Sequence, residues 1–301
     1  MTSEYLVTWR LFAPYICHEW SRMVQLLCLP TGDKSGVMIK NEQNCAVRAD
    51  DFILQYKLDR AEVVKSVGPK LVPFLKTVCV YFVAWLPETE KPTVFAALLK
   101  ILPILCLGGF VSLQGISLEK QHNYSRRILL GLIFSGIGDV FLVWKNTYFI
   151  HGMAAFGIAH ILYIRALGFQ PLNWLVGLLC VFPGLLMYYM CYPGLKGILV
   201  IAVLIYGFII TGMMWRAITG VQNQIEENGL CRWTRMSACI GAALFYLSDN
   251  IIAINKFCFP VPGARALIMT TYYAGQMGIA VSAFNIDEEY NLRMKSSKKI
   301  E

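Results

Sequence analysis

Eight stretches of about 20 mostly apolar residues constrain the fold of this 301-residue chain more than any other feature. They lie roughly at residues 71–87, 92–113, 128–145, 147–166, 172–192, 195–215, 235–255 and 264–285. A helix of this length crosses the hydrocarbon core of a bilayer. Because 56% of all residues are apolar and only 15% are charged, we expect these stretches to lie in lipid. The sequence therefore predicts an all-α, polytopic membrane protein, a single bundle of about eight transmembrane helices.

Composition and motifs also exclude other classes of protein. The ten cysteines include no C-x-x-C pair and the four histidines no H-E-x-x-H motif, so we expect no metal ion. We expect no cofactor either, because the sequence has no nucleotide-binding motif. The net charge of +8 arises in loops between apolar stretches, which argues against a nucleic-acid partner. We divide the chain into an N-terminal extension of unknown structure (1–62), the transmembrane domain (63–286) and a basic tail (287–301).

The distribution of basic residues among the loops predicts the orientation of the bundle in the membrane. In an eight-span arrangement, thirteen of the lysines and arginines that follow residue 60 lie on one side of the membrane and five on the other. Basic residues favour the cytosolic side, so we expect both termini in the cytosol. The chain ends with Lys298 and Lys299 before its last two residues, which resembles the dilysine retrieval signal of endoplasmic-reticulum membrane proteins. We therefore expect the protein in that membrane.

Two aspartates lie inside predicted spans, where a charge is costly and usually functional. Asp139 precedes Lys145 by six residues, and Asp249 precedes Lys256 by seven. At a rise of ~1.5 Å per residue, both carboxylates lie about 9–11 Å below the non-cytosolic end of the bundle. They therefore share one depth.

Other polar side chains reach a similar band, about 10–17 Å from the same face by the same helical rise. They are Lys100, His160, Tyr272, Tyr273 and Gln276. The sequence thus permits one buried polar pocket built from the second, third, fourth, seventh and eighth spans.

Three interpretations of the aspartates remain open from the residues alone. Two neighbouring carboxylates in a low-dielectric site suit acid–base catalysis, one protonated and one anionic, on an acid-labile bond of a lipid. Alternatively, they form helix-packing ion pairs with Lys100 or Lys76. A third possibility is a proton- or cation-coupled transport site.

Short motifs follow one another in order along the spans. They are LKILP (99–103), GLIFSGIGD (131–139), HG (151–152), HILY (160–163), ALF (243–245), SD (248–249), NKFCFPVP (255–262) and TYYAGQ (271–276). Across roughly residues 65–285 the chain resembles the lysoplasmalogenase family, the YhhN-type membrane proteins that include the animal transmembrane protein 86 group. Residues 1–62 show no such resemblance.

The resemblance implies a membrane-embedded hydrolase whose substrates are a lysophospholipid and water. It would cleave the vinyl ether bond of lysoplasmalogens to a fatty aldehyde and glycerophosphoethanolamine or glycerophosphocholine. Asp139 and Asp249 would then divide the acid and the anion or base roles. The supporting or substrate-binding residues would be Lys100, His160, Tyr163, Tyr272, Tyr273 and Gln276. The rival hypotheses are a proton-coupled lipid or small-solute transporter and a non-catalytic lipid-binding protein.

Overall fold

The computed structural model describes residues 67–84, 93–114, 122–170, 172–222 and 229–284. The expected N-terminal extension, the basic tail and its two lysines lie outside these residues. The domain boundaries inferred from the sequence therefore stay predictions.

The described residues are almost entirely helical and include no strand, which confirms the all-α prediction. The helices are Val67–Ala84, α3 (Val94–Ser112), α4 (Asn123–Val143), α5 (Lys145–Leu167), α6 (Trp174–Cys191), α7 (Ile198–Gln222), α8 (Gly229–Ala253) and α9 (Ala264–Val281). Two short turns, the 3-10 helix η2 (Tyr192–Gly194) and the π-helix η3 (Ile254–Cys258), follow α6 and α8. Each apolar stretch of the sequence therefore corresponds to one helix.

Within the described residues, six helices are long and apolar enough to cross a membrane. The two that fall short are α4 and α9, which carry polar side chains such as Asp139, Gln276 and Arg265. Both pack against several other helices in the bundle. That these two helices also span the bilayer stays a prediction.

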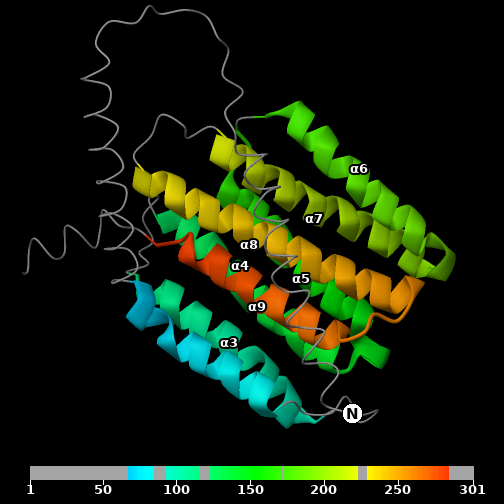
Figure 1. Cartoon of the computed structure of the whole chain (residues 1–301), viewed down its shortest axis with the longest axis horizontal. Coiled ribbons are helices and arrows are strands. Elements are labelled where there is room, and N and C mark those ends of the chain that lie inside the picture. The colour runs from blue at the N-terminus through cyan, green and yellow to red at the C-terminus, as the bar shows by residue number, and fades with distance from the viewer. Residues whose placement is uncertain (1–66, 85–92, 115–121, 171, 223–228, 285–301) are drawn as a thin grey trace, which may run out of the picture.

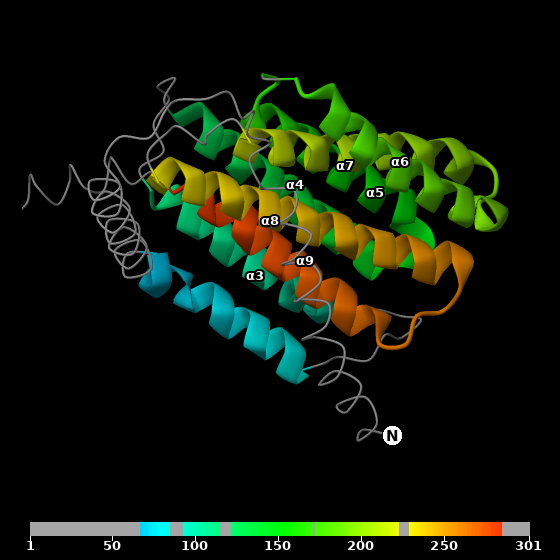
Figure 2. The ribbon, with the colours of Figure 1, turned by 45° about the horizontal axis from the view of Figure 1, so that its top comes forward.

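The helices run side by side along one direction, with α9 between α8 and α3 (Figures 1 and 2). Helix Val67–Ala84 and α3 lie along one side, and α6 and α7 lie along the other. Neighbours in sequence pack together for α3–α4, α4–α5, α6–α7, α7–α8 and α8–α9, as the short connections predict. The exception is α5, which packs mainly against α4 and α7 rather than against α6.

Glycines bring α8 and α9 into backbone contact. A Cβ on Gly241 would lie 2.7 Å from the carbonyl oxygen of Gly275, and one on Gly278 would lie 2.9 Å from the Cα of Gly241. Small residues at a helix crossing allow this close approach, which is a main source of helix association in lipid. Gly241 and Gly278 therefore permit close contact between the two helices, and the position of α9 relative to α8 is closely defined.

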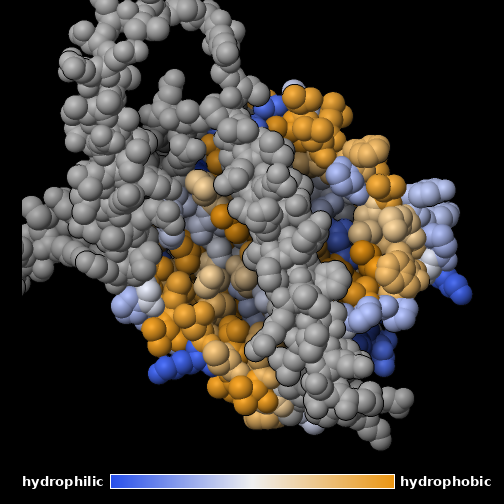
Figure 3. Space-filling model, in the orientation of Figure 1, coloured by the Kyte–Doolittle hydropathy of each residue, from blue (hydrophilic) through white to orange (hydrophobic). Residues whose placement is uncertain are grey.

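The outer surface of the bundle is apolar. Figure 3 shows hydrophobic side chains over much of the visible surface of α6 and of the pair formed by α3 and helix Val67–Ala84. On α6, Leu178, Phe182 and Tyr189 each expose more than two thirds of their surface, at 69%, 72% and 76%. Exposed apolar patches of this extent mark protein-facing or membrane-facing surfaces, and the length and composition of α6 fit a membrane span.

Candidate active site

The Asp139 carboxylate lies in the centre of the bundle, only 2% exposed, and both of its oxygens are engaged. Lys100 of α3 places its Nζ 3.1 Å from Oδ1, and Tyr272 of α9 donates a hydrogen bond of 2.5 Å from its hydroxyl to Oδ2. Three helices thus meet at one carboxylate. Buried charges are tolerated when they are paired and hydrogen-bonded in this way.

Small residues on α4 make room for the rings that surround this carboxylate. A Cβ on Gly138 would lie 2.7 Å from the ring of Phe156, and one on Gly131 would lie 2.2 Å from Cε1 of Tyr163. Both rings belong to α5, so the two glycines allow α5 to pack closely against the face of α4 that includes Asp139. The sequence run GLIFSGIGD therefore contains both the buried aspartate and the glycines that make room for the rings around it.

The Asp249 carboxylate forms a second cluster with α5 and α7. Its Oδ2 accepts a short hydrogen bond from the hydroxyl of Tyr206 and lies 3.4 Å from Nε2 of His160. The same Nε2 lies 3.0 Å from the Tyr206 hydroxyl, and the His160 side chain is fully buried. Asp249 is more accessible than Asp139, with 14% of its side chain exposed. Within the described residues, no hydrogen bond engages its Oδ1.

Aromatic packing joins the two clusters. The ring of Phe245 lies 4.6 Å from that of His160 and 5.3 Å from that of Tyr272, centroid to centroid. The two aspartates therefore belong to one buried site with two halves.

Polar atoms without a protein partner surround this site. Tyr163 donates a hydrogen bond of 2.9 Å to Oε1 of Gln276, but Nε2 of that amide is buried and has no partner among the described residues. The same holds for Nδ1 of His160 and the hydroxyl of Ser135. An unsatisfied buried polar group costs about 1–3 kcal/mol, and such groups in native proteins usually mark a bound water or ligand. The site therefore has unused hydrogen-bonding capacity for polar atoms of a substrate.

The structure brings together the residues singled out from the sequence. All eight lie in the bundle interior or at its edge: Asp139, Asp249, Lys100, His160, Tyr163, Tyr272, Tyr273 and Gln276. Tyr273 approaches Lys100 rather than a carboxylate, since its hydroxyl donates to the Lys100 carbonyl oxygen at 2.8 Å. Lys76 is exposed, so of the two lysines proposed as counter-ions it is Lys100 that pairs with Asp139.

Sequence reasoning missed two polar residues. Tyr206 lies in an apolar stretch that has no charged residue between Lys196 and Arg216. Ser135 lies in the run GLIFSGIGD, but the sequence alone gives it no role. A signal for Tyr206 exists, because it follows Lys196 by ten residues and therefore lies at nearly the depth of the aspartates. Among the described residues, no group of three or more histidine, cysteine or acidic side chains is arranged to hold a metal.

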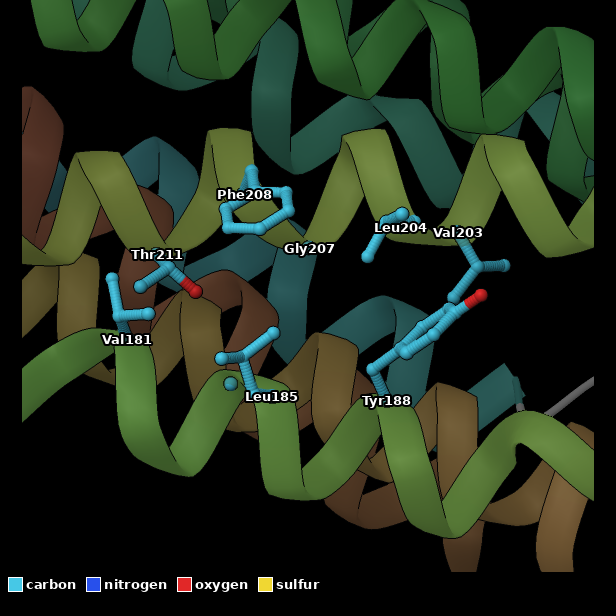
Figure 4. A pocket seen from close by; sticks show the side chains of 9 residues that line it. Val181, Leu185, Tyr188, Val203, Leu204, Gly207, Phe208 and Thr211 are labelled. Atoms are coloured by element: carbon cyan, nitrogen blue, oxygen red, sulfur yellow. The ribbon is translucent and has the colours of Figure 1, made fainter.

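A shallow apolar hollow lies elsewhere, between α6 and α7. Its lining residues are Val181, Gly184, Leu185, Tyr188, Val203, Leu204, Gly207, Phe208 and Thr211. Figure 4 shows side chains from the two helices facing each other across it. None of the eight residues of the candidate site lines this hollow. Tyr206, next to Gly207 in sequence, contacts Asp249 instead.

Comparison with known proteins identifies relatives along most of the chain. The sequence model of the YhhN family matches residues 95–283. The lysoplasmalogenase TMEM86A of Bos taurus is 50% identical over 222 residues, which cover 73% of this chain and 91% of that protein. The human lysoplasmalogenase TMEM86A is 46% identical over the same shares, and the human lysoplasmalogenase TMEM86B is 38% identical over 71% of this chain and 85% of its own length. No solved structure matches significantly.

Proposed function

The chain belongs to the YhhN family, and on this premise we propose that it is a lysoplasmalogenase that hydrolyses the vinyl ether bond of lysoplasmalogens. The products are a fatty aldehyde and glycerophosphoethanolamine or glycerophosphocholine. The observation that carries this proposal is the buried pair of carboxylates, Asp139 and Asp249, each held by a different set of donors. Relatives named lysoplasmalogenase support the same reaction.

Asp249 is the proton donor of the proposed mechanism. Its Oδ1 is not engaged by any described residue, and 14% of its side chain is exposed, so this oxygen is able to take up a proton and to approach a substrate. In its protonated form it transfers its proton to the β-carbon of the vinyl ether, which leaves an oxocarbenium ion at the α-carbon. His160 and Tyr206 contact the other carboxyl oxygen, Oδ2, so they fix the orientation of the Asp249 carboxyl group.

Asp139 is the anion of the proposed mechanism. Because Lys100 and Tyr272 donate to both of its oxygens, the ionised form satisfies every contact seen in the structure. The negative charge stabilises the oxocarbenium ion and accepts the proton of the water that adds to the α-carbon. The resulting hemiacetal collapses as the glycerol oxygen takes the proton held by Asp139 and leaves as an alcohol, while the hemiacetal hydroxyl gives its proton to Asp249 and becomes the aldehyde oxygen. One water is consumed for each aldehyde released.

The unsatisfied atoms near the two carboxylates fit the remaining demands of this reaction. The Gln276 amide, the Ser135 hydroxyl and Nδ1 of His160 supply buried donors and acceptors for the attacking water and the glycerol oxygens. The ammonium of Lys100, with 15% of its side chain exposed, is the cation available to the phosphate of the substrate. We assign these supporting roles from the hydrogen-bonding groups of the side chains and from their positions around the two carboxylates.

Aldehyde release by the purified protein tests the proposal. Lysoplasmalogen is compared with an ester lysolipid of the same headgroup, for the wild-type chain and for Asp139→Asn and Asp249→Asn. We expect aldehyde from the vinyl ether lipid alone and a loss of about 10²–10⁴-fold in each variant, the usual contribution of a general acid or base. Size-exclusion profiles identical to that of the wild-type protein would show that the variants fold.

The rival functions predict other outcomes. A transporter would produce no aldehyde but would move solute across sealed vesicles, with flux lost in the same two variants. A lipid-binding protein would bind lysoplasmalogen saturably without turnover. Full hydrolytic activity in either variant would remove that aspartate from the mechanism while leaving the reaction itself in place.

We also propose that the protein is in the endoplasmic reticulum with both termini in the cytosol. The asymmetry of lysines and arginines between the loops and the terminal Lys298–Lys299 pair support this orientation. An epitope tag inserted in the basic tail ahead of Lys298, so that the last four residues stay at the chain end, should be stained after digitonin opens the plasma membrane alone. Staining that requires permeabilised internal membranes would contradict the proposal.

A further inference from the structure

Two cysteines from distant parts of the sequence meet at one end of the bundle. Cys191 ends α6, Cys258 ends η3, and their sulfur atoms lie 3.4 Å apart. Cys191 is buried, with 1% of its surface exposed, whereas Cys258 is partly accessible. Neither residue contributes to the site of Asp139 and Asp249, so the proximity of the two sulfurs has no explanation in the proposed reaction.

The backbone around the pair holds the two segments tightly together. Gly194 packs directly against the backbone of Phe257. A Cβ at this position would lie only 2.0 Å from the Phe257 carbonyl oxygen, so a residue with a side chain does not fit there. The Cys258 sulfur also lies 3.5 Å from the carbonyl oxygen of Met190, and the Cys191 sulfur lies 4.0 Å from Sδ of Met187. The two turns therefore approach closely on both sides of the cysteines, as a cross-link between them requires.

The two cysteines lie at the end of the bundle that faces an oxidising compartment in the proposed orientation. The turns η2 and η3 lie at the end opposite the first residues of helix Val67–Ala84 and the last residues of α9 (Figure 1). In the orientation proposed above, that end faces the side away from the cytosol. Disulfides form and persist in that compartment, whereas cytosolic thiols are kept reduced.

We infer that Cys191 and Cys258 form a disulfide bond that ties the α6–α7 turn to the α8–α9 turn. The oxidant is a disulfide of the compartment, on glutathione or on a thiol oxidoreductase. The accessible Cys258 thiolate attacks it and releases one thiol, which gives a mixed disulfide on Cys258. The Cys191 thiolate then attacks the Cys258 sulfur and expels the second thiol. Two cysteine thiols are oxidised, one external disulfide is reduced to two thiols, and two protons balance the exchange.

The bond would enclose a long loop, since 67 positions separate the two cysteines. Cross-links over loops of this length restrict the unfolded chain and stabilise the folded one. For a domain of this size, we expect reduction to lower the melting temperature by about 10 °C. The residues that contact the two sulfurs, Met187 and Met190, are not part of the site of Asp139 and Asp249, so we expect the bond to have a small effect on activity.

Peptide mass spectrometry of the full-length protein from endoplasmic-reticulum membranes tests this inference. Acid first stops thiol exchange, and the protein is then denatured at neutral pH with an excess of maleimide, which blocks the free thiols before any reductant is added. We expect a Cys191–Cys258 linked peptide that disappears on reduction. In Cys191→Ser, the Cys258 sulfur should be found alkylated or as a mixed disulfide, whereas Cys180→Ser should leave the linked peptide unchanged.

Melting temperature gives a second measurement that does not depend on peptide coverage. Reductant should destabilise the wild-type protein and Cys180→Ser but leave the Cys191→Ser/Cys258→Ser double variant unchanged. Maleimide on both sulfurs of the unreduced wild-type protein would overturn the inference, and so would a link from either sulfur to a third cysteine. Because aldehyde release plays no part in these measurements, they succeed or fail independently of the proposed hydrolysis.

Discussion

Replacing Tyr272 by phenylalanine removes a single hydrogen bond from the proposed anion. The hydroxyl donates to Oδ2 of Asp139 at 2.5 Å, and the ring packs edge-on against Phe156 and Phe245 at centroid distances of 5.9 and 5.3 Å. Phenylalanine preserves these ring contacts. The substitution therefore isolates the contribution of the hydroxyl to the position and charge of the carboxylate.

The burial of both partners sets the size of the effect. Tyr272 is 4% exposed and Asp139 is 2% exposed, so water has little access to replace the lost donor. A hydrogen bond to a charged group contributes about 1.5–3 kcal/mol, and each ~1.4 kcal/mol corresponds to a tenfold change in rate. We expect the Tyr272→Phe rate of aldehyde release at saturating substrate to fall by roughly 10–150-fold, with a small change in KM.

The neighbouring tyrosine provides a matched control. Tyr273 is equally buried, but its hydroxyl donates to the backbone carbonyl oxygen of Lys100 rather than to a carboxylate. Tyr273→Phe should lose only about 0.5–1.5 kcal/mol of stability and retain most of its turnover. Aldehyde release is followed continuously with an aldehyde dehydrogenase. Equal turnover rates for Tyr272→Phe and the wild-type protein would refute the anionic role of Asp139, as would a larger loss in Tyr273→Phe.

Two further substitutions test the packing and the charge around the site. Gly131→Ala puts a methyl group 2.2 Å from the Tyr163 ring and should lower stability by about 1–3 kcal/mol, whereas Gly109→Ala, with nothing within 4 Å, should be neutral or stabilising in a thermal melt. A Gly131 variant that melts like the wild-type protein would contradict the close packing of α4 and α5. Lys100→Met leaves the Asp139 carboxylate buried without its cation and should cost about 3–5 kcal/mol together with turnover. Unchanged melting and activity would show that the ion pair is dispensable.

The sequence predicts the helices and the depth of the site but not the rotation of each helix. Counting residues from Lys145 and Lys256 places both aspartates in one layer, and the structure brings both into one site. Depth follows from helical rise alone, because every transmembrane helix begins near the same plane. Which face of a helix looks inward depends on its neighbours, and here glycine contacts such as Gly241 against Gly275 decide it.

Tyr206 is a residue whose contacts depend on the rotation of its helix, which the sequence does not predict. By composition, α7 is an ordinary apolar span, and a tyrosine inside such a span is usually a packing residue. The packing of α7 against α5 and α8 directs this side chain to His160 and Asp249. The neighbouring residue Gly207 lies instead in the apolar hollow against α6. Two adjacent residues thus face opposite partners, a distinction that helical phase determines and composition does not.

The contacts of Asp139 have a consequence for how the site is assembled. Asp139 belongs to α4, but its two partners, Lys100 and Tyr272, belong to α3 and α9, which come before and after α4 in the chain. The carboxylate has both partners only when the three helices have packed together, so assembly of the bundle and assembly of the site are one event. A nascent chain that ends before α9 leaves the Asp139 carboxylate without the Tyr272 hydroxyl.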